Sequence, residues 1–189
     1  MATRLQLDLD PADEDTNGFA NDVTAASGAA LTLAETSSGD SLAHQVVITP
    51  SVSVTGNYTL TGTDADGRAQ TETLATDTTN AVTSSKYFLT LTEVLAPSGI
   101  GAATVDIGWA DEFASKTLVL DTYASNATSF QVLVTGTINF DIEVTLQDPL
   151  KTGLDAPFDF DDQEDLAWLN DANFTAKTAS LGNTLAIPG

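Results

Sequence analysis

The chain has 189 residues, enough for one substantial domain with an extension. It carries 27 acidic residues against 6 scattered basic ones, a formal net charge of −21, and no cysteine. These values exclude direct nucleic-acid binding, disulfides and thiolate metal sites. No apolar run approaches the roughly 18 residues that a membrane helix needs.

The polar residues favour strands and turns. They are mostly threonine, serine, aspartate and glycine rather than lysine and glutamate, a mixture typical of β-rich chains. The acidic charge is expected to keep the protein soluble. Salt screens the self-repulsion of so many like charges, so a saline environment fits this composition.

The first predicted elements are a strand and an arm. Thr3–Leu9 alternates leucines with polar residues, the pattern of a half-buried strand. Asp10–Asp22 then combines proline, glycine and acids, which predicts a loop or an extended arm that reaches a partner. Short strands are expected at Ala29–Ala34 and at Ala43–Thr49.

A β-meander is predicted over Asn57–Trp109. An Asp-Gly pair at Asp66 and Gly67 is a strong hairpin signal, because glycine takes the positive φ that such a turn requires. A second turn is expected between the last two strands of the meander, which we expect to pair. The four strands are Val52–Thr63, Arg68–Leu74, Tyr87–Leu95 and Ala102–Trp109.

The C-terminal part continues with strands and then changes character. Ile138–Leu146 alternates apolar and polar residues strictly, the clearest strand pattern in the chain. After Pro149, acids and aromatics concentrate, and Asp162–Leu169 is expected to form one or two helical turns. Other strands are expected at Lys116–Asp121, Ser129–Thr135, Phe174–Ala179 and Leu185–Ile187.

These patterns together predict an all-β protein. About ten short strands separated by turn signals are typical of an antiparallel β-sandwich. We expect this sandwich to occupy residues 1–150, with the N-terminal strand and the acidic arm, and residues 151–189 to form an acidic, aromatic, irregular extension.

His44 is the one histidine in the chain. It lies beside alternating apolar residues, a setting typical of a structural or surface histidine rather than a general base. No serine lies in a nucleophile-elbow pattern. We therefore predict a non-enzymatic protein with no cofactor and no catalytic residues.

A weak calcium motif lies in the acidic arm. Asp13, Asp15, Asn17 and Gly18 match the first half of a calcium-loop pattern. The bidentate acid expected six residues after the glycine is replaced by Thr24. A solvated acidic loop is the better interpretation, and Asp64 with Asp66 is likewise explained by the hairpin turn.

The C-terminal acids and aromatics are candidates for contact with a partner. Paired carboxylates are a glycosidase feature, but acids this close in sequence more often form a solvated face or a helix N-terminus. Phe158, Phe160 and Trp168 are the predicted partner-contact residues, since aromatics anchor interfaces. Trp109 is expected to pack in the core or against a subunit. The acidic cluster consists of Asp159, Asp161, Asp162, Glu164 and Asp165.

One part of the chain resembles virion structural proteins of tailed bacteriophages. The likeness rests on the segments NYTLTGTDADGRAQTETL, TTNAVTSSKYFLTLTEVLAPSGIGAATVDIGW and FQVLVTGTINFDIEVTLQDPL, with a tryptophan-containing piece at Trp168. It extends from about Val46 to Leu181. Its motifs are β-sheet patterns, and it brings no catalytic residues.

The resemblance implies a component of a phage particle. The expected role is a capsid decoration (cement) protein on the outer surface of the head, bound to the major capsid protein and to copies of itself as a homo-oligomer. A tail, neck or head-fibre protein is the alternative, followed by a carbohydrate-binding or hydrolytic β-sandwich. Neither nucleic acid nor a membrane is an expected partner.

Overall fold

The computed structural model describes residues 8–76 and 80–117, and the backbone of four further short strands. The chain forms two compact units, the first holding strands β1 to β7 and the second β8 to β11. The described residues 8–76 and 80–117 all belong to the first unit, and the expected boundary at residue 150 stays a prediction. The expected strand Thr3–Leu9 lies mostly outside the described residues.

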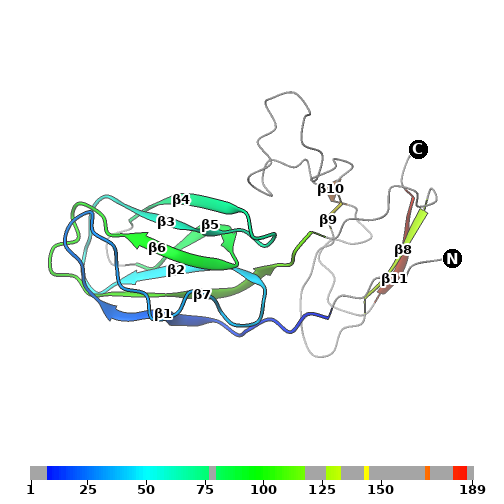
Figure 1. The fold of residues 1–189 in the computed structure, drawn as a ribbon, viewed down its shortest axis with the longest axis horizontal. Coiled ribbons are helices and arrows are strands. Elements are labelled where there is room, and N and C mark those ends of the chain that lie inside the picture. Colours follow the sequence, from blue (N-terminus) through cyan, green and yellow to red (C-terminus); the bar gives the residue numbers. More distant parts are fainter. Residues whose placement is uncertain are drawn as a thin grey trace, which may run out of the picture. The chain divides into compact units, whose positions relative to one another are not determined.

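The first unit contains two antiparallel sheets that pack face to face (Figure 1). One sheet has the order β1-β7-β2-β5 and the other has the order β4-β3-β6. This confirms the predicted all-β sandwich. The strands are β1 (Asp15–Val23), β2 (Ala43–Pro50), β3 (Asn57–Thr63), β4 (Ala69–Ala75), β5 (Val82–Phe88), β6 (Thr90–Leu95) and β7 (Val105–Ala114).

The core lies between the two sheets. The inward-facing residues of each sheet meet those of the opposite sheet. The largest enclosed side chains include Tyr58, Phe19, Phe88, Ile48 and Leu60. No helix long and apolar enough to cross a membrane occurs among the described residues.

The β3–β4 hairpin confirms the Asp-Gly turn prediction. The two strands pair without a register shift, from Asn57 opposite Ala75 to Thr63 opposite Ala69. Gly67 has a φ of 80° in the turn, a conformation that costs glycine little. The hairpin therefore follows from residues that are neighbours in the sequence.

The predicted meander is wrong after this hairpin. The expected strand Tyr87–Leu95 is divided at Leu89, so that β5 belongs to the four-stranded sheet and β6 to the three-stranded one. The Leu89 amide donates to the Thr63 carbonyl oxygen at 2.9 Å, which anchors the crossing. The expected pair Tyr87–Leu95 with Ala102–Trp109 does not form, because β6 and β7 lie in different sheets.

The predicted extended arm is also wrong over much of its length. Residues Asp15–Val23 form β1, which pairs with β7 at the edge of the four-stranded sheet. Phe19 and Ala20 are buried in the core. The segment was expected to be a loop because it is rich in acids. It is instead an edge strand that is held to the core by two buried apolar residues.

The second unit has two strand pairs. Strand β8 (Ala127–Val132) pairs with β11 (Leu181–Ala186), and β9 (Glu143–Val144) pairs with β10 (Leu169–Asn170). Strands were expected around β8, β9 and the end of β11. Leu169, expected to end a helical turn, begins β10 instead. The rest of the predicted helix, most of Ile138–Leu146 and all of Phe174–Ala179 lie outside the described residues.

Candidate functional site

The four-stranded sheet is irregular at one level along its strands. Opposite Gln45 of β2, strand β7 carries the bulge Ala110–Glu112. Opposite Val46, strand β5 carries the bulge Ser84–Lys86. At the adjacent position of β7, Gly108 faces the bulged segment 16–19 of β1. Bulges interrupt the backbone ladder and redirect side chains, so this belt of bulges is the candidate site.

The β1 bulge passes over Trp109. The indole Nε1 donates to the Asp13 carbonyl oxygen at 3.0 Å, and the ring meets Phe19 edge-on with centroids 5.0 Å apart. A Cβ at Gly18 would overlap the indole ring, and one at Gly108 would overlap the Asp15 carbonyl oxygen. Both glycines therefore allow the chain to cover Trp109, which is 9% exposed.

The bulge in β5 is bridged by a side chain. The Ser84 hydroxyl accepts a hydrogen bond from the Val46 amide at 2.7 Å and donates to the Lys86 carbonyl oxygen at 2.7 Å. Ser84 is buried, and its two bonds replace those that the ladder lacks at this position. Its role is to satisfy the backbone.

His44 bridges the bulge in β7. Its ring is 1% exposed, with Nδ1 3.0 Å from the Ala110 carbonyl oxygen and Nε2 2.7 Å from Oδ2 of Asp40. The bulge turns the Ala110 carbonyl away from regular pairing, and the imidazole supplies a donor. This confirms the expectation of a structural histidine.

Asp40 joins three segments of the first unit. Its oxygens accept hydrogen bonds from the Ala12 amide before β1, the Leu42 amide, the Ser38 hydroxyl and the His44 ring. Burial alone would raise the pKa of this carboxyl, but the hydrogen bonds outweigh it and lower the pKa from 3.8 to about 2. Asp40 is therefore an ionised carboxylate at neutral pH.

The calcium candidates do not converge. Oδ1 of Asp15 accepts a hydrogen bond from the backbone amide of Asn17 at 3.1 Å, and the side-chain Nδ2 of Asn17 donates to Oδ1 of Asn21 at 3.4 Å. Asp13 contributes its backbone carbonyl to Trp109. Within residues 8–76 and 80–117, no three His, Asp or Glu side chains are placed to hold a metal ion.

The acids of the β3–β4 turn support the turn. Oδ1 of Asp64 accepts the amides of Asp66 and Arg68 at 2.8 and 2.9 Å, and Asp66 accepts the Thr117 amide at 2.7 Å. Arg68 lies 3.5 Å from Asp66 in an ion pair. Burial raises the pKa of Asp64. These bonds fit the hairpin explanation of the motif.

Side chains of β4 cover the edge of β5. Glu72 accepts the amides of Ser85 and Lys86, at 2.8 and 3.1 Å. Gln70 donates to the Tyr87 carbonyl oxygen at 2.6 Å. Groups that an edge strand would otherwise offer to a foreign strand are thereby occupied.

The segment from Gly28 to Thr36 connects the β6 edge of one sheet with the β1 edge of the other. The Leu31 amide donates to the Val94 carbonyl oxygen of β6, and the Leu91 amide of β6 donates to the Thr36 carbonyl oxygen, both at 2.8 Å. The Ala34 amide donates to the Phe19 carbonyl oxygen of β1, also at 2.8 Å. A strand was expected at Ala29–Ala34, and this segment instead hydrogen-bonds to both edges.

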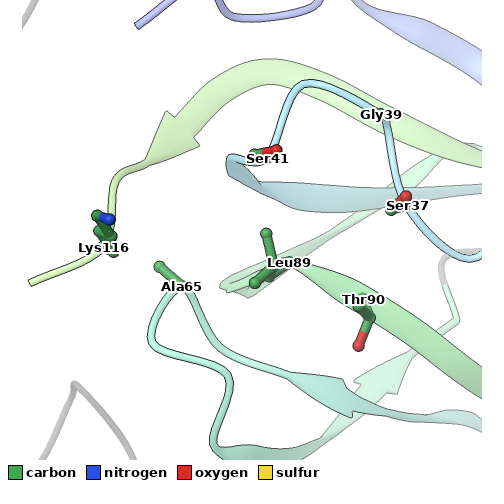
Figure 2. Close-up of a pocket in the computed structure, with 7 residues that line it drawn as sticks. All are labelled: Ser37, Gly39, Ser41, Ala65, Leu89, Thr90 and Lys116. Atoms are coloured by element: carbon green, nitrogen blue, oxygen red, sulfur yellow. The ribbon is translucent and has the colours of Figure 1, made fainter. Parts of the chain in front are cut away.

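One open concavity of about 320 Å³ lies at the junction of β5 and β6 (Figure 2). Thr90, Leu89 and Ala65 line it on one side, Ser41 on another, and Lys116 at its rim. Its polar groups are hydroxyls and a single ammonium. None of the residues that the sequence singled out as site candidates lines it.

Three aromatic side chains of the first unit have partners within the chain. Phe88 and Trp109 are buried, and the Tyr87 hydroxyl donates to Glu112 at 3.4 Å. A sugar platform built on Trp109 is therefore incompatible with the covered indole. The partner-contact candidates Phe158, Phe160 and Trp168 and the acidic cluster at 159–165 lie outside the described residues.

Sequence reasoning missed how Asp40 and Ser84 are used. Asp40 and His44 are four residues apart. That spacing predicts a side-chain contact on a helix, but it predicts none in a segment that runs from a loop into a strand. Ser84 lies in a run of polar residues with no distinctive neighbour. Gly108 directly before Trp109 was the one visible hint of close backbone approach.

Comparison with family models, curated proteins and solved structures found no match for this chain. The class that the structure defines is the all-β sandwich of the first unit.

Proposed function

We propose that the chain is a non-enzymatic structural component of a phage particle, which binds the major capsid protein as a decoration protein and stabilises the head. The phage assignment is supported by the resemblance of the segments between Val46 and Leu181 to virion structural proteins. The decoration role is supported by the sandwich itself, in which backbone groups of the β1, β5 and β6 edges are hydrogen-bonded within the chain. The whole chain carries 27 acidic residues against 6 basic ones.

The observation that carries the non-enzymatic proposal is the use made of reactive side chains. His44, Asp40 and Ser84 are the groups in the described region that most resemble catalytic residues. Their hydrogen bonds go to backbone groups, to one another and, for Asp40, to the Ser38 hydroxyl. Such a belt holds a sheet in shape and leaves no activated nucleophile facing a cavity.

Three of the four sheet edges bear on how a partner is bound. Since backbone groups of the β5, β6 and β1 edges are hydrogen-bonded within the chain, strand addition at these edges is not the proposed mode. Contact is made through side chains, with Phe158, Phe160 and Trp168 as anchors. Many copies with modest interfaces then add up through multivalency on the shell.

Charge sets the orientation on the capsid. With a net charge of −21, the protein meets basic patches of the major capsid protein, and carboxylates elsewhere face the solvent. Like charges on neighbouring copies repel, which favours spacing on a lattice over aggregation.

Copy number per particle tests the proposed function. Quantitative mass spectrometry of purified virions is expected to find on the order of hundreds of copies, as symmetric capsid positions require. About a dozen copies or fewer would place the chain in the tail or neck instead. Complete absence from particles would refute a virion role.

Binding of the full chain to capsids that lack it tests the anchors. Trp168→Ala, and separately Phe158→Ala with Phe160→Ala, are expected to weaken binding at least tenfold, as the loss of a buried aromatic anchor does. Val52→Ser is the matched control, because Val52 is an apolar side chain 51% exposed in the sandwich unit. Equal binding by all variants would place the interface elsewhere.

A further inference from the structure

Strand β4 forms one edge of the three-stranded sheet. At its turn end the Asp64 amide donates to the Arg68 carbonyl oxygen at 2.9 Å, and at its other end the Thr76 amide donates to the Gly56 carbonyl oxygen at 3.1 Å. In an antiparallel ladder, every second residue pair exchanges backbone hydrogen bonds. Because the register has no shift, the even-numbered residues of β4 bond β3, and the odd-numbered residues direct their amides and carbonyls away from it.

The outward backbone groups of β4 are open. They belong to Ala69, Thr71, Thr73 and Ala75, and all four residues are exposed. Among the described residues, none hydrogen-bonds these groups. The strand also contains no proline, no lysine and no bulge, the features that usually keep an edge strand from pairing with another chain. Strand β4 is therefore a regular, unprotected edge, in contrast to β1, β5 and β6.

We propose that β4 pairs antiparallel with β4 of a second copy of the chain, which joins the two three-stranded sheets into one continuous sheet. An antiparallel pair of identical strands has two-fold symmetry, the commonest symmetry of homodimers. A pair centred on Thr71 places Ala69 opposite Thr73 of the second copy and makes about six backbone hydrogen bonds. The exposed side chains that meet there are short and uncharged, so the two strands can approach closely.

Charge favours this edge over the four-stranded sheet. The only acids in the strands of the three-stranded sheet are Glu72 and Glu93. Two copies that each carry a net charge of −21 repel least where the fewest carboxylates meet. The strands at the β1 edge of the other sheet, β1 and β7, together carry Asp15, Asp22, Asp106, Asp111 and Glu112.

Glu72 determines the register of the pair. Its carboxylate accepts the Ser85 and Lys86 amides of its own chain, at 2.8 and 3.1 Å. Pairing centred on Glu72 would place two carboxylates directly opposite each other, which destabilises a sheet. Pairing centred on Thr71 places Glu72 opposite Gln70 of the second copy, so that no like charges meet directly.

The interface is small, and this sets the expected affinity. One pair of seven-residue strands lies at or below the roughly 1,200 Å² that marks the low end of stable complexes. We therefore expect a Kd between about 10 μM and 1 mM. Salt screens the repulsion between the acidic copies, so dimerisation should strengthen as salt rises. The inference concerns contact between copies and does not depend on a virion role.

Sedimentation equilibrium of the full chain tests for the dimer. Between about 10 μM and 1 mM protein in about 0.5 M salt, we expect the mass to shift from monomer towards dimer, and to shift less at low salt. A monomer at every concentration would overturn the proposal. A dimer that weakens as salt rises would also overturn it, because that behaviour indicates an interface of ion pairs.

Variants at Thr71 test whether the dimer forms through β4. Thr71→Pro removes an outward amide that bonds nothing in β3, a position where an edge strand tolerates proline. Thr71→Glu keeps the amide and places two carboxylates opposite each other at the axis. Each should raise the Kd at least tenfold. Thr92→Glu adds the same charge at an exposed position of β6, on the other edge of the sheet, and should leave the Kd unchanged.

Amide hydrogen exchange identifies what covers the edge. The Thr71 and Thr73 amides should be protected at the high end of the concentration range and exchange fast at the low end. The Glu72 amide, which faces β3, should be protected at both. Protection of Thr71 in the monomer would mean that the chain covers its own edge, and would overturn the proposal. If Thr71→Pro does not fold, Thr71→Glu decides, and a dimer that persists in it would place the interface elsewhere.

Discussion

The β3–β4 hairpin and the four-stranded sheet are held together in different ways. In the hairpin, backbone groups pair with backbone groups from end to end with no shift of register. In the four-stranded sheet, each of the three strand pairings is interrupted by a bulge, and side chains of Ser84 and His44 replace the missing bonds. Single side chains should therefore matter far more in the sheet than in the hairpin.

The largest expected effect contrasts two glycines. Gly108→Ala places a Cβ against the Asp15 backbone, which neither strand can avoid, and should cost about 3 kcal/mol or more of unfolding free energy. Gly67→Ala in the hairpin turn has open space around the new Cβ and should cost about 1–2 kcal/mol, from the positive φ alone. Denaturant titration measures both. Equal costs would mean that the close approach at Gly108 is easily relieved.

Two adjacent serines provide the next contrast. Ser84→Ala removes the hydroxyl that bonds the Val46 amide and the Lys86 carbonyl oxygen, and should destabilise by about 1–3 kcal/mol. Ser85→Ala removes an exposed hydroxyl that bonds Glu72, so its effect should stay within about 0.5 kcal/mol. Chemical denaturation of the two variants is the measurement. If Ser85→Ala is the more harmful change, the bulge is not held through Ser84.

Acid should weaken the sheet through Asp40. Its pKa is lowered from 3.8 to about 2 in the folded protein, so its stabilisation is present above pH 3.8 and lost as pH falls towards 2. The loss should amount to about 2 kcal/mol. Asp40→Asn should be less stable at neutral pH and show a shallower acid limb in stability measurements between pH 5 and 2. Identical acid limbs would contradict this role.

The smallest expected effect lies in the hairpin. The buried Tyr58 hydroxyl hydrogen-bonds no described residue, so Tyr58→Phe should leave stability unchanged or raise it by about 1 kcal/mol. Burial raises the pKa of Tyr58 from 10 to about 12, which makes folding oppose its ionisation. Stability should fall as pH rises from 10 towards 12, and the phenylalanine variant should lack that part of the fall. Thermal unfolding at pH 8 and 11 compares the two proteins.

The hairpin was predictable because its determinants are local. Asp66 and Gly67 mark the turn, and threonine-rich alternation marks both strands, so neighbours in the sequence become neighbours in the sheet. The division at Leu89 has no such mark. A run from Tyr87 to Leu95 reads as one strand, and its assignment to two sheets depends on the distant Thr63 carbonyl.

The belt of bulges was not predictable, because it depends on contacts between residues far apart in the sequence. Strand β1 reads as an acidic loop because only Phe19 and Ala20 anchor it, and its partner β7 lies about ninety residues away in the chain. The roles of Asp40 and Ser84 appear only when the strands have come together. The sequence did indicate that His44 is structural, since apolar alternation surrounds it.

Cryo-EM of purified phage particles is the most direct test of the proposed decoration role. We expect a seven-stranded sandwich at symmetry-related positions on the outer face of the capsid, in contact with the major capsid protein. Density for this fold at the tail or neck alone, or a shell without it, would contradict the decoration role.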